Sequence, residues 1–501
     1  MSPEADAPSS RFFELLCVGM VGVAALLATY AAASRGIWLD EFWSLHLGRD
    51  SVAFETLARM DWTRDTHPAL ANLLYRTTTA LGFEDIIARR LALNAPPLIA
   101  LAGAMALFTR RLADDEAAFP ATLLLLTLAL SATIGSFADY RSYGWQIAAV
   151  TTTVGYAFWL LHRNTEAAEA LPHAVGLTGV FFAISLHYVI GLTASVFVLA
   201  LFVQLWVGQR RRDAVRLALA ASAAWLLTLA SAIALLRDMS RSIDHAWIKT
   251  STFDAIVLLG YTALLVILAN PVVAVLSLGG RNPATAFKSM LAAAIVAALA
   301  LLLVVNAITP VVVERYLVGW QVLICGLVAA AASTSLRQRP LALAAALTVS
   351  MVGMGVHAHG VASQGGWNAN LGAIVSEVEA CPATRVFAVS AQRLTVIRST
   401  SLSKRESAMI ADAYRSLGRS RGIDVEILDL DGPAALPSPS DCPTLLWIEH
   451  LDWAYVGNVT QLLRIGRFTV SGGAYRATVR TSDSGFLVRF AKSSAPDEQG
   501  L

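Results

Sequence analysis

The chain is poor in charged residues. Asp, Glu, Lys and Arg make up only 15% of its 501 residues, whereas 56% are hydrophobic, and ordinary globular domains are roughly a quarter charged. This composition argues against a soluble protein and indicates a membrane protein. The 38 Lys and Arg residues nearly balance the 36 Asp and Glu residues, so the chain lacks the basic field that binds nucleic acid. We therefore expect no nucleic-acid partner.

Motifs for nucleotides and tightly bound metals are also missing. The sequence has no HExxH, no CxxC, no P-loop and no GxGxxG between a strand and a helix. Nothing therefore indicates direct use of a nucleotide, and the sequence establishes no cofactor. A divalent metal stays open as an alternative, with Glu41 and His67 as its candidate ligands.

Only four cysteines are present. Cys17 and Cys325 lie inside apolar runs, where a small buried hydrophobic residue is the expected interpretation. Cys381 and Cys442 each precede a proline in the more polar C-terminal part. A disulfide between these two and a pair of free thiols are equal alternatives, because the sequence does not supply their geometry.

Apolar runs, by contrast, are abundant. Eleven have the length of about 17 to 25 residues with which a helix crosses the hydrocarbon core of a bilayer: 12–34, 87–109, 117–135, 142–161, 172–188, 190–208, 214–236, 254–277, 288–307, 317–335 and 340–358. We therefore predict a mainly α, polytopic membrane protein with about 11 transmembrane helices. An odd number of spans places the two termini on opposite sides of the membrane.

The basic residues between these runs predict the orientation. They gather on one side, which the positive-inside rule assigns to the cytoplasm: Arg110, Arg111, Arg163, Arg210, Arg211, Arg212, Arg281, Lys288, Arg337 and Arg339. The N-terminus is then cytoplasmic. The loop at 35–86 and everything after about residue 360 are extracytoplasmic.

Hydropathy falls after Gly360, and the pattern changes to strands that alternate with a helix. Short runs rich in β-branched and aromatic residues predict strands at 384–390, 423–428, 444–449 and 484–490, with a helix at 404–421. We therefore predict two domains. Residues 1–360 form the transmembrane domain, whose first extracytoplasmic loop, 35–86, contains a juxtamembrane helix, and residues 361–501 form an extracytoplasmic α/β domain.

Two adjacent acids follow the first span, Asp40 and Glu41. Desolvation and mutual repulsion at a membrane boundary raise the pKa of a carboxyl group toward the range of a general base. Neighbouring side chains on a helix point about 100° apart, so only one of the two can face a given site, and we favour Asp40. The alternative is that the acids merely mark the end of a membrane span.

Other chemically active residues lie at the same predicted boundary. They come from distant parts of the chain: His67, Arg141, Tyr143, His187, Tyr188, Arg315 and Tyr316. An arginine stays charged and binds phosphate with two hydrogen bonds, and a histidine can bind a phosphate, a hydroxyl or a metal. A single charged residue at a bilayer boundary is ordinary, but several on one side predict a site.

In sequence order these residues form short motifs, namely DE at Asp40–Glu41, HP at His67–Pro68, RxY at 141–143, HY at 187–188 and RYL at 315–317. Together they resemble the bacterial GT-C membrane glycosyltransferases of the protein mannosyltransferase and aminoarabinose transferase type, over most of residues 12–335. The resemblance departs at HPALANLLYR, which lacks the second proline and the aromatics that often follow HP in that family.

The resemblance implies a GT-C-like fold and an inverting transfer of a hexosyl or pentosyl group from a polyprenyl-phosphate donor. The acceptor would be an extracytoplasmic glycolipid, polysaccharide or protein of the cell envelope, and the protein would span the bacterial cytoplasmic (inner) membrane. It implies that Asp40 is the catalytic base and that Glu41 belongs to the same catalytic pair. The implied ligands of the donor phosphate are Arg141, Tyr143, Arg315 and Tyr316, and the residues implied to contact the substrate or support the site are His67, His187 and Tyr188.

Two other functions remain open at this point. A transporter or flippase of lipid-linked glycans would require polar residues and helix breaks near the middle of the membrane, whereas these apolar runs are mostly uninterrupted. A non-catalytic membrane scaffold that presents residues 361–501 to partners would leave the boundary residues without a purpose.

Overall fold

The computed structural model describes residues 8–60, 62, 65, 67–163, 169–239, 250–279, 285–308, 310–390, 401–428, 434–439, 441–449, 453–471 and 475–493. The chain divides into two compact units. The first comprises Met1–Ala33 and Leu47–Val361, and the second comprises Ser34–His46 and Ala362–Leu501. The sequence placed the connector Ser34–His46 with the membrane spans. In the structure it groups with the C-terminal residues, because its backbone is hydrogen-bonded to them.

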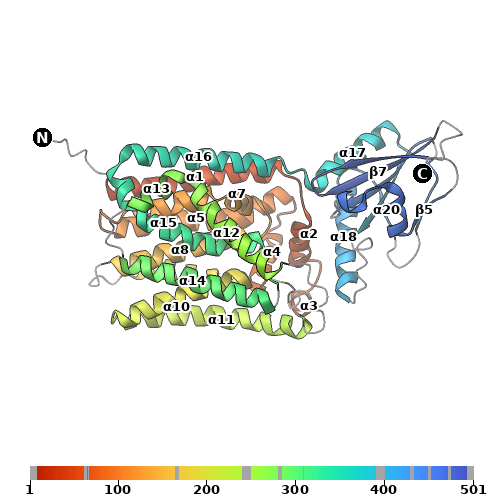
Figure 1. The fold of residues 1–501 in the computed structure, drawn as a ribbon. Helices are drawn as coiled ribbons and strands as arrows, with labels where there is room; N and C mark the ends of the chain where they lie inside the picture. The colour runs from red at the N-terminus through yellow and green to blue at the C-terminus, as the bar shows by residue number, and fades with distance from the viewer. Residues whose placement is uncertain are drawn as a thin grey trace. The chain divides into compact units, whose positions relative to one another are not determined.

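The described part of the first unit is helical (Figure 1), and its long helices run side by side. Its elements are α1 (Ser10–Ser34), α3 (Phe54–Met60), α4 (Ala69–Ala80), α5 (Ile86–Arg111), α6 (Ala118–Ala129), α7 (Ser131–Ala138), α8 (Tyr143–His162), α9 (Ala170–Ser185), α10 (Tyr188–Val207), α11 (Arg211–Met239), α12 (Thr252–Ala269), α13 (Pro271–Gly279), α14 (Thr285–Ile308), the 3-10 turn η3 (Glu314–Tyr316), α15 (Val318–Gln338) and α16 (Pro340–Ala362). The short helix expected in the first loop is α3.

Every predicted span contains a helix, but fewer helices satisfy the length and composition of a membrane span. Among the described residues eight do so, or nine if the bent pair α6 and α7 is one span. The pair bends by 77° at Leu130, whose backbone is extended. The helix α9 has only 16 residues, and Gln146 and three threonines dilute the apolar character of α8. The predicted number of about 11 therefore exceeds the eight or nine that the helices support.

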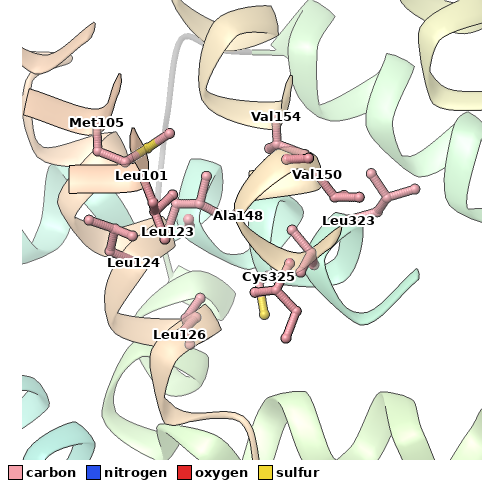
Figure 2. Close-up of a cluster of buried hydrophobic side chains, with 14 of the residues drawn as sticks. Leu101, Met105, Leu123, Leu124, Leu126, Ala148, Val150, Val154, Leu323 and Cys325 are labelled. Carbon is pink, nitrogen blue, oxygen red and sulfur yellow. The ribbon is translucent and has the colours of Figure 1, made fainter. Parts of the chain in front are cut away.

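The core of the first unit surrounds α6, whose 12 residues are all buried. A helix that is apolar on every side is expected to be enclosed by other helices, and α5, α8 and α15 contribute buried side chains to the same core. Figure 2 shows part of this packing, in which Leu101 and Met105 of α5 lie near Leu123 of α6, and Cys325 of α15 is enclosed. Cys17 is buried as well.

The second unit contains a five-stranded sheet in the order β2-β1-β4-β7-β6. Parallel pairing joins β1 (Arg385–Ser390) to β2 (Val425–Ile427) and to β4 (Thr444–Glu449), and antiparallel pairing joins β7 (Gly485–Lys492) to β4 and to β6 (Tyr475–Thr481). All six residues of β4 are buried, as expected for a central strand covered on both faces. The predicted strands are present, and the predicted α/β character of this region is confirmed.

Helices cover both faces of this sheet. On one face lie α17 (Gly366–Ala380) and α18 (Ser401–Arg419), and the other face packs against α19 (Trp453–Val456), α20 (Val459–Gly466) and a small parallel sheet of β3 (Ala434–Leu436) and β5 (Phe468–Val470). A disulfide joins Cys381, just after α17, to Cys442, just before β4. The structure thus selects one of the two alternatives that the sequence left open for these cysteines.

Candidate functional site

Arg141 lies in the short connection between α7 and α8 and is buried. The backbone on both sides of it is fixed by α4 and α5. The Ser142 amide donates a hydrogen bond to the Tyr75 hydroxyl at 3.1 Å, and the side-chain amide of Asn94 donates one to the Asp139 carbonyl oxygen at 2.6 Å. The connection is therefore held by side chains that are themselves buried, and Arg141 is presented from a rigid support.

A histidine lies next to this guanidinium. Nη2 of Arg141 is 3.4 Å from Nε2 of His67, and because the guanidinium can only donate, Nε2 of His67 accepts. The imidazole proton then resides on Nδ1, which lies 3.7 Å from the buried Asp65 carboxylate. Asp65, His67 and Arg141 thus form a line of carboxylate, imidazole and guanidinium inside the first unit.

A second histidine, His187, lies between α9 and α10, and its ring contacts that of His67 with 5.0 Å between ring centres. Its Nδ1 accepts hydrogen bonds from the backbone amides of Val189 and Ile190 at 3.2 and 3.5 Å and so caps α10. Burial lowers the pKa of His187 well below its usual value, and neighbouring positive charges, Arg141 among them, act in the same direction. The ring is therefore neutral near pH 7.

The cap determines which nitrogen of this neutral ring carries the proton. Because Nδ1 of His187 accepts two hydrogen bonds, the proton is on Nε2. That atom is buried and has no hydrogen-bond partner among the described residues. Leaving a buried donor unsatisfied is costly, so a donor held in this way is suited to an acceptor that arrives from outside the chain.

Aromatic rings complete the group. The Tyr316 ring centre lies 4.4 Å from that of His187 and 6.5 Å from that of Tyr143. The guanidinium of Arg141 lies 5.8 Å from the Tyr143 ring centre, and that of Arg315 lies 5.5 Å from the Tyr316 ring centre. We call Asp65, His67, Arg141, Tyr143, His187, Arg315 and Tyr316 the Arg141 cluster. Tyr188, the first residue of α10, follows His187 directly.

The cluster combines two guanidinium groups and one neutral imidazole donor with a single buried carboxylate. Arginine and imidazole N–H groups at a protected position bind an oxyanion strongly, since hydrogen bonds to a charged acceptor are about twice as strong as neutral ones. The arrangement is therefore suited to a phosphate group, as the sequence-based interpretation of Arg141, Tyr143, Arg315 and Tyr316 requires.

Asp40 and Glu41 belong to the second unit and lie in the first turn of α2 (Leu39–Gly48). Glu41 is fully buried, and its carboxylate accepts a hydrogen bond from the Trp38 backbone amide at 3.4 Å. This is the contact that an acid at the third helical position makes in a capping box, so Glu41 helps to begin α2. Asp40 is partly exposed.

No group of three or more His, Cys, Asp or Glu side chains suited to a metal ion occurs among the described residues. The candidate ligands from the sequence, Glu41 and His67, instead have the contacts given above. Asp65 had no role assigned from the sequence, and it is the acid that lies beside His67. In the sequence, only the position of Asp65 two residues before His67 could have indicated this contact.

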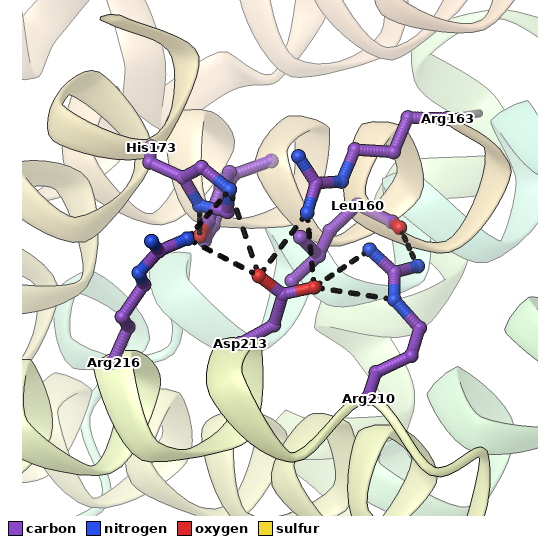
Figure 3. Close-up of polar contacts among 7 residues, drawn as sticks. Leu160, Arg163, His173, Arg210, Asp213 and Arg216 are labelled. Carbon is purple, nitrogen blue, oxygen red and sulfur yellow. Dashed lines mark hydrogen bonds and ion pairs between the residues drawn. The ribbon is translucent and has the colours of Figure 1, made fainter. Parts of the chain in front are cut away.

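A different polar cluster lies at the other end of α8 (Figure 3). Both oxygens of Asp213 accept hydrogen bonds from Arg163, at 3.1 and 3.0 Å, and Arg210 donates two more to Oδ2. Arg216 and His173 lie 3.6 Å from Oδ1. We call these five residues the Asp213 cluster. It joins the end of α8 to α9 and α11.

Comparison with solved structures identifies the fold. ArnT from Cupriavidus metallidurans in the apo state matches this chain with a TM-score of 0.50 at 13% identity, over 94% of this chain and 97% of that one. This chain has an ArnT-like fold. ArnT from the same organism bound to undecaprenyl phosphate matches with a TM-score of 0.49 at 14% identity, over 96% and 99% of the two chains. No model of a known protein family and no curated protein matches the sequence.

The ArnT-like fold agrees with the resemblance to GT-C enzymes that the sequence motifs carry. It confirms a polytopic, mainly helical membrane protein with a C-terminal α/β region.

Proposed function

We propose that this protein is an inverting glycosyltransferase that takes a sugar from a polyprenyl-phosphate donor and transfers it to an acceptor on the outer side of a bacterial inner membrane. The observation that carries the proposal is the Arg141 cluster, where a buried Nε2–H of His187 without a partner among the described residues lies beside arginine side chains. The ArnT-like fold and the sequence motifs support the same conclusion. The orientation rests on the positive-inside rule.

The reaction would be a single displacement at the anomeric carbon. The acceptor hydroxyl oxygen forms the new bond, the bond from the anomeric carbon to the phosphate oxygen breaks, and its electron pair stays on the phosphate. The leaving group changes from a phosphodiester with one negative charge to a monoester with about two. Arg141, Arg315 and His187 would stabilise this additional charge through donors that are already oriented.

Asp40 would accept the proton of the acceptor hydroxyl. A positioned general base contributes about 10²–10⁴-fold to a rate, and the partly exposed Asp40 is better suited to this role than Glu41, whose carboxylate caps α2. Glu41 would then support the base through the geometry of the helix. His67 would orient Arg141, and Tyr143, Tyr188 and Tyr316 would line the donor site.

The test uses purified protein in detergent with a pool of radiolabelled polyprenyl-phosphate sugars and cell-envelope acceptors. Wild type is compared with Asp40→Asn and with Asp50→Asn, a control at an exposed acid in the same loop. We expect transfer by wild type and by the control, and a loss of about 10²–10⁴-fold in Asp40→Asn. Retained transfer in Asp40→Asn would exclude it as the base. A wild type that turns over no donor from a broad pool would contradict the transferase and favour a flippase or a scaffold.

A further inference from the structure

The connector before α2 is hydrogen-bonded to the beginning of α17, although more than 320 positions of sequence separate them. The Gly36 amide donates to the Gln364 carbonyl oxygen at 2.9 Å, and the Trp367 amide donates to the Ile37 carbonyl oxygen at 3.0 Å. The two backbone segments are thus joined by one hydrogen bond before Gly365 and one after Gly366. In the sequence, the joined residues Gly36 and Ile37 come directly before the first turn of α2, which contains Asp40 and Glu41.

Glycines make this close approach feasible. A Cβ atom on Gly36 would lie 1.8 Å from the Gly365 carbonyl oxygen, and one on Gly366 would lie 2.4 Å from the Ile37 carbonyl oxygen. Gly366 also has a φ of +48°, which side chains other than glycine rarely adopt. Its amide donates a hydrogen bond to the Asp483 carboxylate at 3.2 Å, so the β6–β7 turn holds the same point.

Side chains extend the contact into the interior formed by residues 362–501, which we call the C-terminal unit. The Phe42 ring of α2 lies 4.8 Å from the fully buried Trp367 ring. Trp367 in turn lies 4.7 Å from Tyr414 of α18, and Tyr414 lies 4.8 Å from Trp447 of β4. A continuous series of rings therefore leads from the residue after Glu41 to the central strand of the sheet.

The inner end of this series is fixed by hydrogen bonds. The Tyr414 hydroxyl donates to the Val389 carbonyl oxygen at 3.2 Å and accepts from the Glu449 amide at 2.8 Å. The indole of Trp447 donates to the Glu449 carboxylate. The rings that α2 contacts are thus bound to two strands, β1 and β4, and have little freedom to move.

We infer that the C-terminal unit positions the catalytic helix α2, with Trp367 and Gly366 as the positioning residues for Asp40 and Glu41. This inference rests on the proposed function, because α2 is catalytic only if Asp40 is the base. The attachment of α2 to the C-terminal unit does not depend on that function. The C-terminal unit then contributes to catalysis by holding α2 in position, and its role is not limited to selecting an acceptor.

The first experiment measures the attachment without activity. Amide hydrogen exchange of residues 39–46 is followed in the purified full chain, in wild type, Gly366→Ala, Trp367→Leu and the conservative Trp367→Phe. We expect exchange in this segment to rise at least tenfold in Gly366→Ala and Trp367→Leu, with unchanged exchange in α15, and to stay near the wild-type rate in Trp367→Phe. Unchanged exchange in both disruptive variants would overturn the inference.

The matched control is Gly372→Ala on the same helix, where an added Cβ meets nothing within 4 Å. It should exchange as wild type does. If it raises exchange in 39–46 as much as Gly366→Ala, the effect belongs to α17 in general and the inference fails.

The second experiment measures transfer from the polyprenyl-phosphate donor. A displaced base lowers kcat and leaves the KM for the donor nearly unchanged, so we expect kcat to fall about tenfold or more in Gly366→Ala and Trp367→Leu and to recover in Trp367→Phe. Equal changes in kcat and KM, together with a lower melting temperature, would show a general structural defect and overturn the inference. If wild type transfers no sugar, the proposed function fails, while the exchange result still decides whether α2 is held by the C-terminal unit.

Discussion

Each end of α8 carries a buried cluster that contains arginine and histidine, and the two histidines differ in how their nitrogens are used. The helix has 20 residues, so its ends lie about 30 Å apart. In the Asp213 cluster, Nδ1 of His173 lies 2.8 Å from the Tyr156 hydroxyl and Nε2 lies 3.3 Å from Arg216. In the Arg141 cluster, Nδ1 of His187 caps α10, whereas Nε2 has no partner among the described residues.

We propose that this difference distinguishes a cluster that stabilises the fold from one that binds the donor phosphate. Asp213 receives hydrogen bonds from two arginines and contacts a third, and a buried carboxylate surrounded in this way has no capacity left for a ligand. The Arg141 cluster keeps a buried donor available beside positive charge, which is the expected property of a site that binds an anion.

Asp213→Ala should destabilise the fold. It leaves the half-buried Arg163 and Arg210 without their carboxylate, and removing one partner of an ion pair costs up to about 3–5 kcal/mol where the pair is buried. The melting temperature of the purified protein in detergent should fall, while kcat per folded molecule stays within about twofold of wild type, because sites more than about 10 Å apart act independently to within about 0.5 kcal/mol. An unchanged melting temperature would contradict the structural role of the Asp213 cluster. A loss of kcat without a loss of stability would show that the Asp213 cluster takes part in transfer, as we propose for the Arg141 cluster.

Arg141→Met should act in the opposite way. Removal of one oriented donor from a developing oxyanion costs about 10²–10³-fold in rate, so transfer should fall by that factor. Arg163→Met is the matched control, because Arg163 belongs to the Asp213 cluster and should affect stability more than kcat. Transfer by Arg141→Met within a factor of about three of wild type would contradict its role with the donor phosphate, since that is far below the loss of a catalytic donor.

Glu449 of β4 is a buried acid that is held by neutral side chains. Glu449 accepts hydrogen bonds from Asn370 and Ser484, and burial raises its pKa from 4.5 to about 7, with the nearby Asp483 acting in the same direction. The folded chain then binds a proton between these pH values that the unfolded chain has released. Its stability should therefore fall as pH rises from 4.5 to about 7, by about 1.4 kcal/mol per pH unit at most, and change no further above that.

Glu449→Gln should remove this pH dependence, because glutamine cannot titrate. Melting temperatures of the full chain across that range provide the measurement, with wild type losing stability toward neutral pH and the variant following a flatter curve. Two parallel curves would show that the carboxyl group of Glu449 has the same pKa in both states.

The smallest expected effect separates the two roles of His187. His187→Asn keeps an oxygen that can cap α10 but loses Nε2–H, so it should lower kcat/KM for the donor about tenfold, as the loss of one hydrogen bond to a charged group does, at nearly unchanged stability. His187→Ala should show the same kcat/KM and lose about 0.5–2 kcal/mol of stability in addition, because the cap is also gone. Equal kcat/KM values for wild type and both variants would show that Nε2 does not contact the donor.

Much of the Arg141 cluster could be predicted from the sequence, because a membrane boundary can be located by hydropathy. Arg141, His187 and Arg315 each follow or precede an apolar run, and the structure brings them into one cluster. Asp65 could not be assigned in this way. Its contact with His67 depends on the local path of a polar loop, for which the sequence offered no periodicity.

The fold was predictable to a similar degree. The helices and the strands β1, β2, β4 and β7 followed from apolar runs and alternation. Among the described residues eight or nine helices have the length and composition of a span where about 11 were predicted, because α8 contains Gln146 and three threonines and α9 has only 16 residues. The attachment of Ser34–His46 to the C-terminal unit could not be foreseen. It depends on the close approach of Gly36 and Gly365, a contact between distant segments that no local pattern encodes.

Binding of a polyprenyl phosphate to the purified protein tests directly whether the Arg141 cluster holds the donor phosphate, because this measurement requires neither the sugar nor the acceptor. Affinities are compared for wild type, Arg141→Met and Arg163→Met under one salt concentration. We expect a dissociation constant at least about tenfold higher for Arg141→Met, equivalent to about 1.4 kcal/mol, and a wild-type value for Arg163→Met. Equal affinities in all three proteins, or an equal loss in both variants, would contradict the assignment of the phosphate site to the Arg141 cluster.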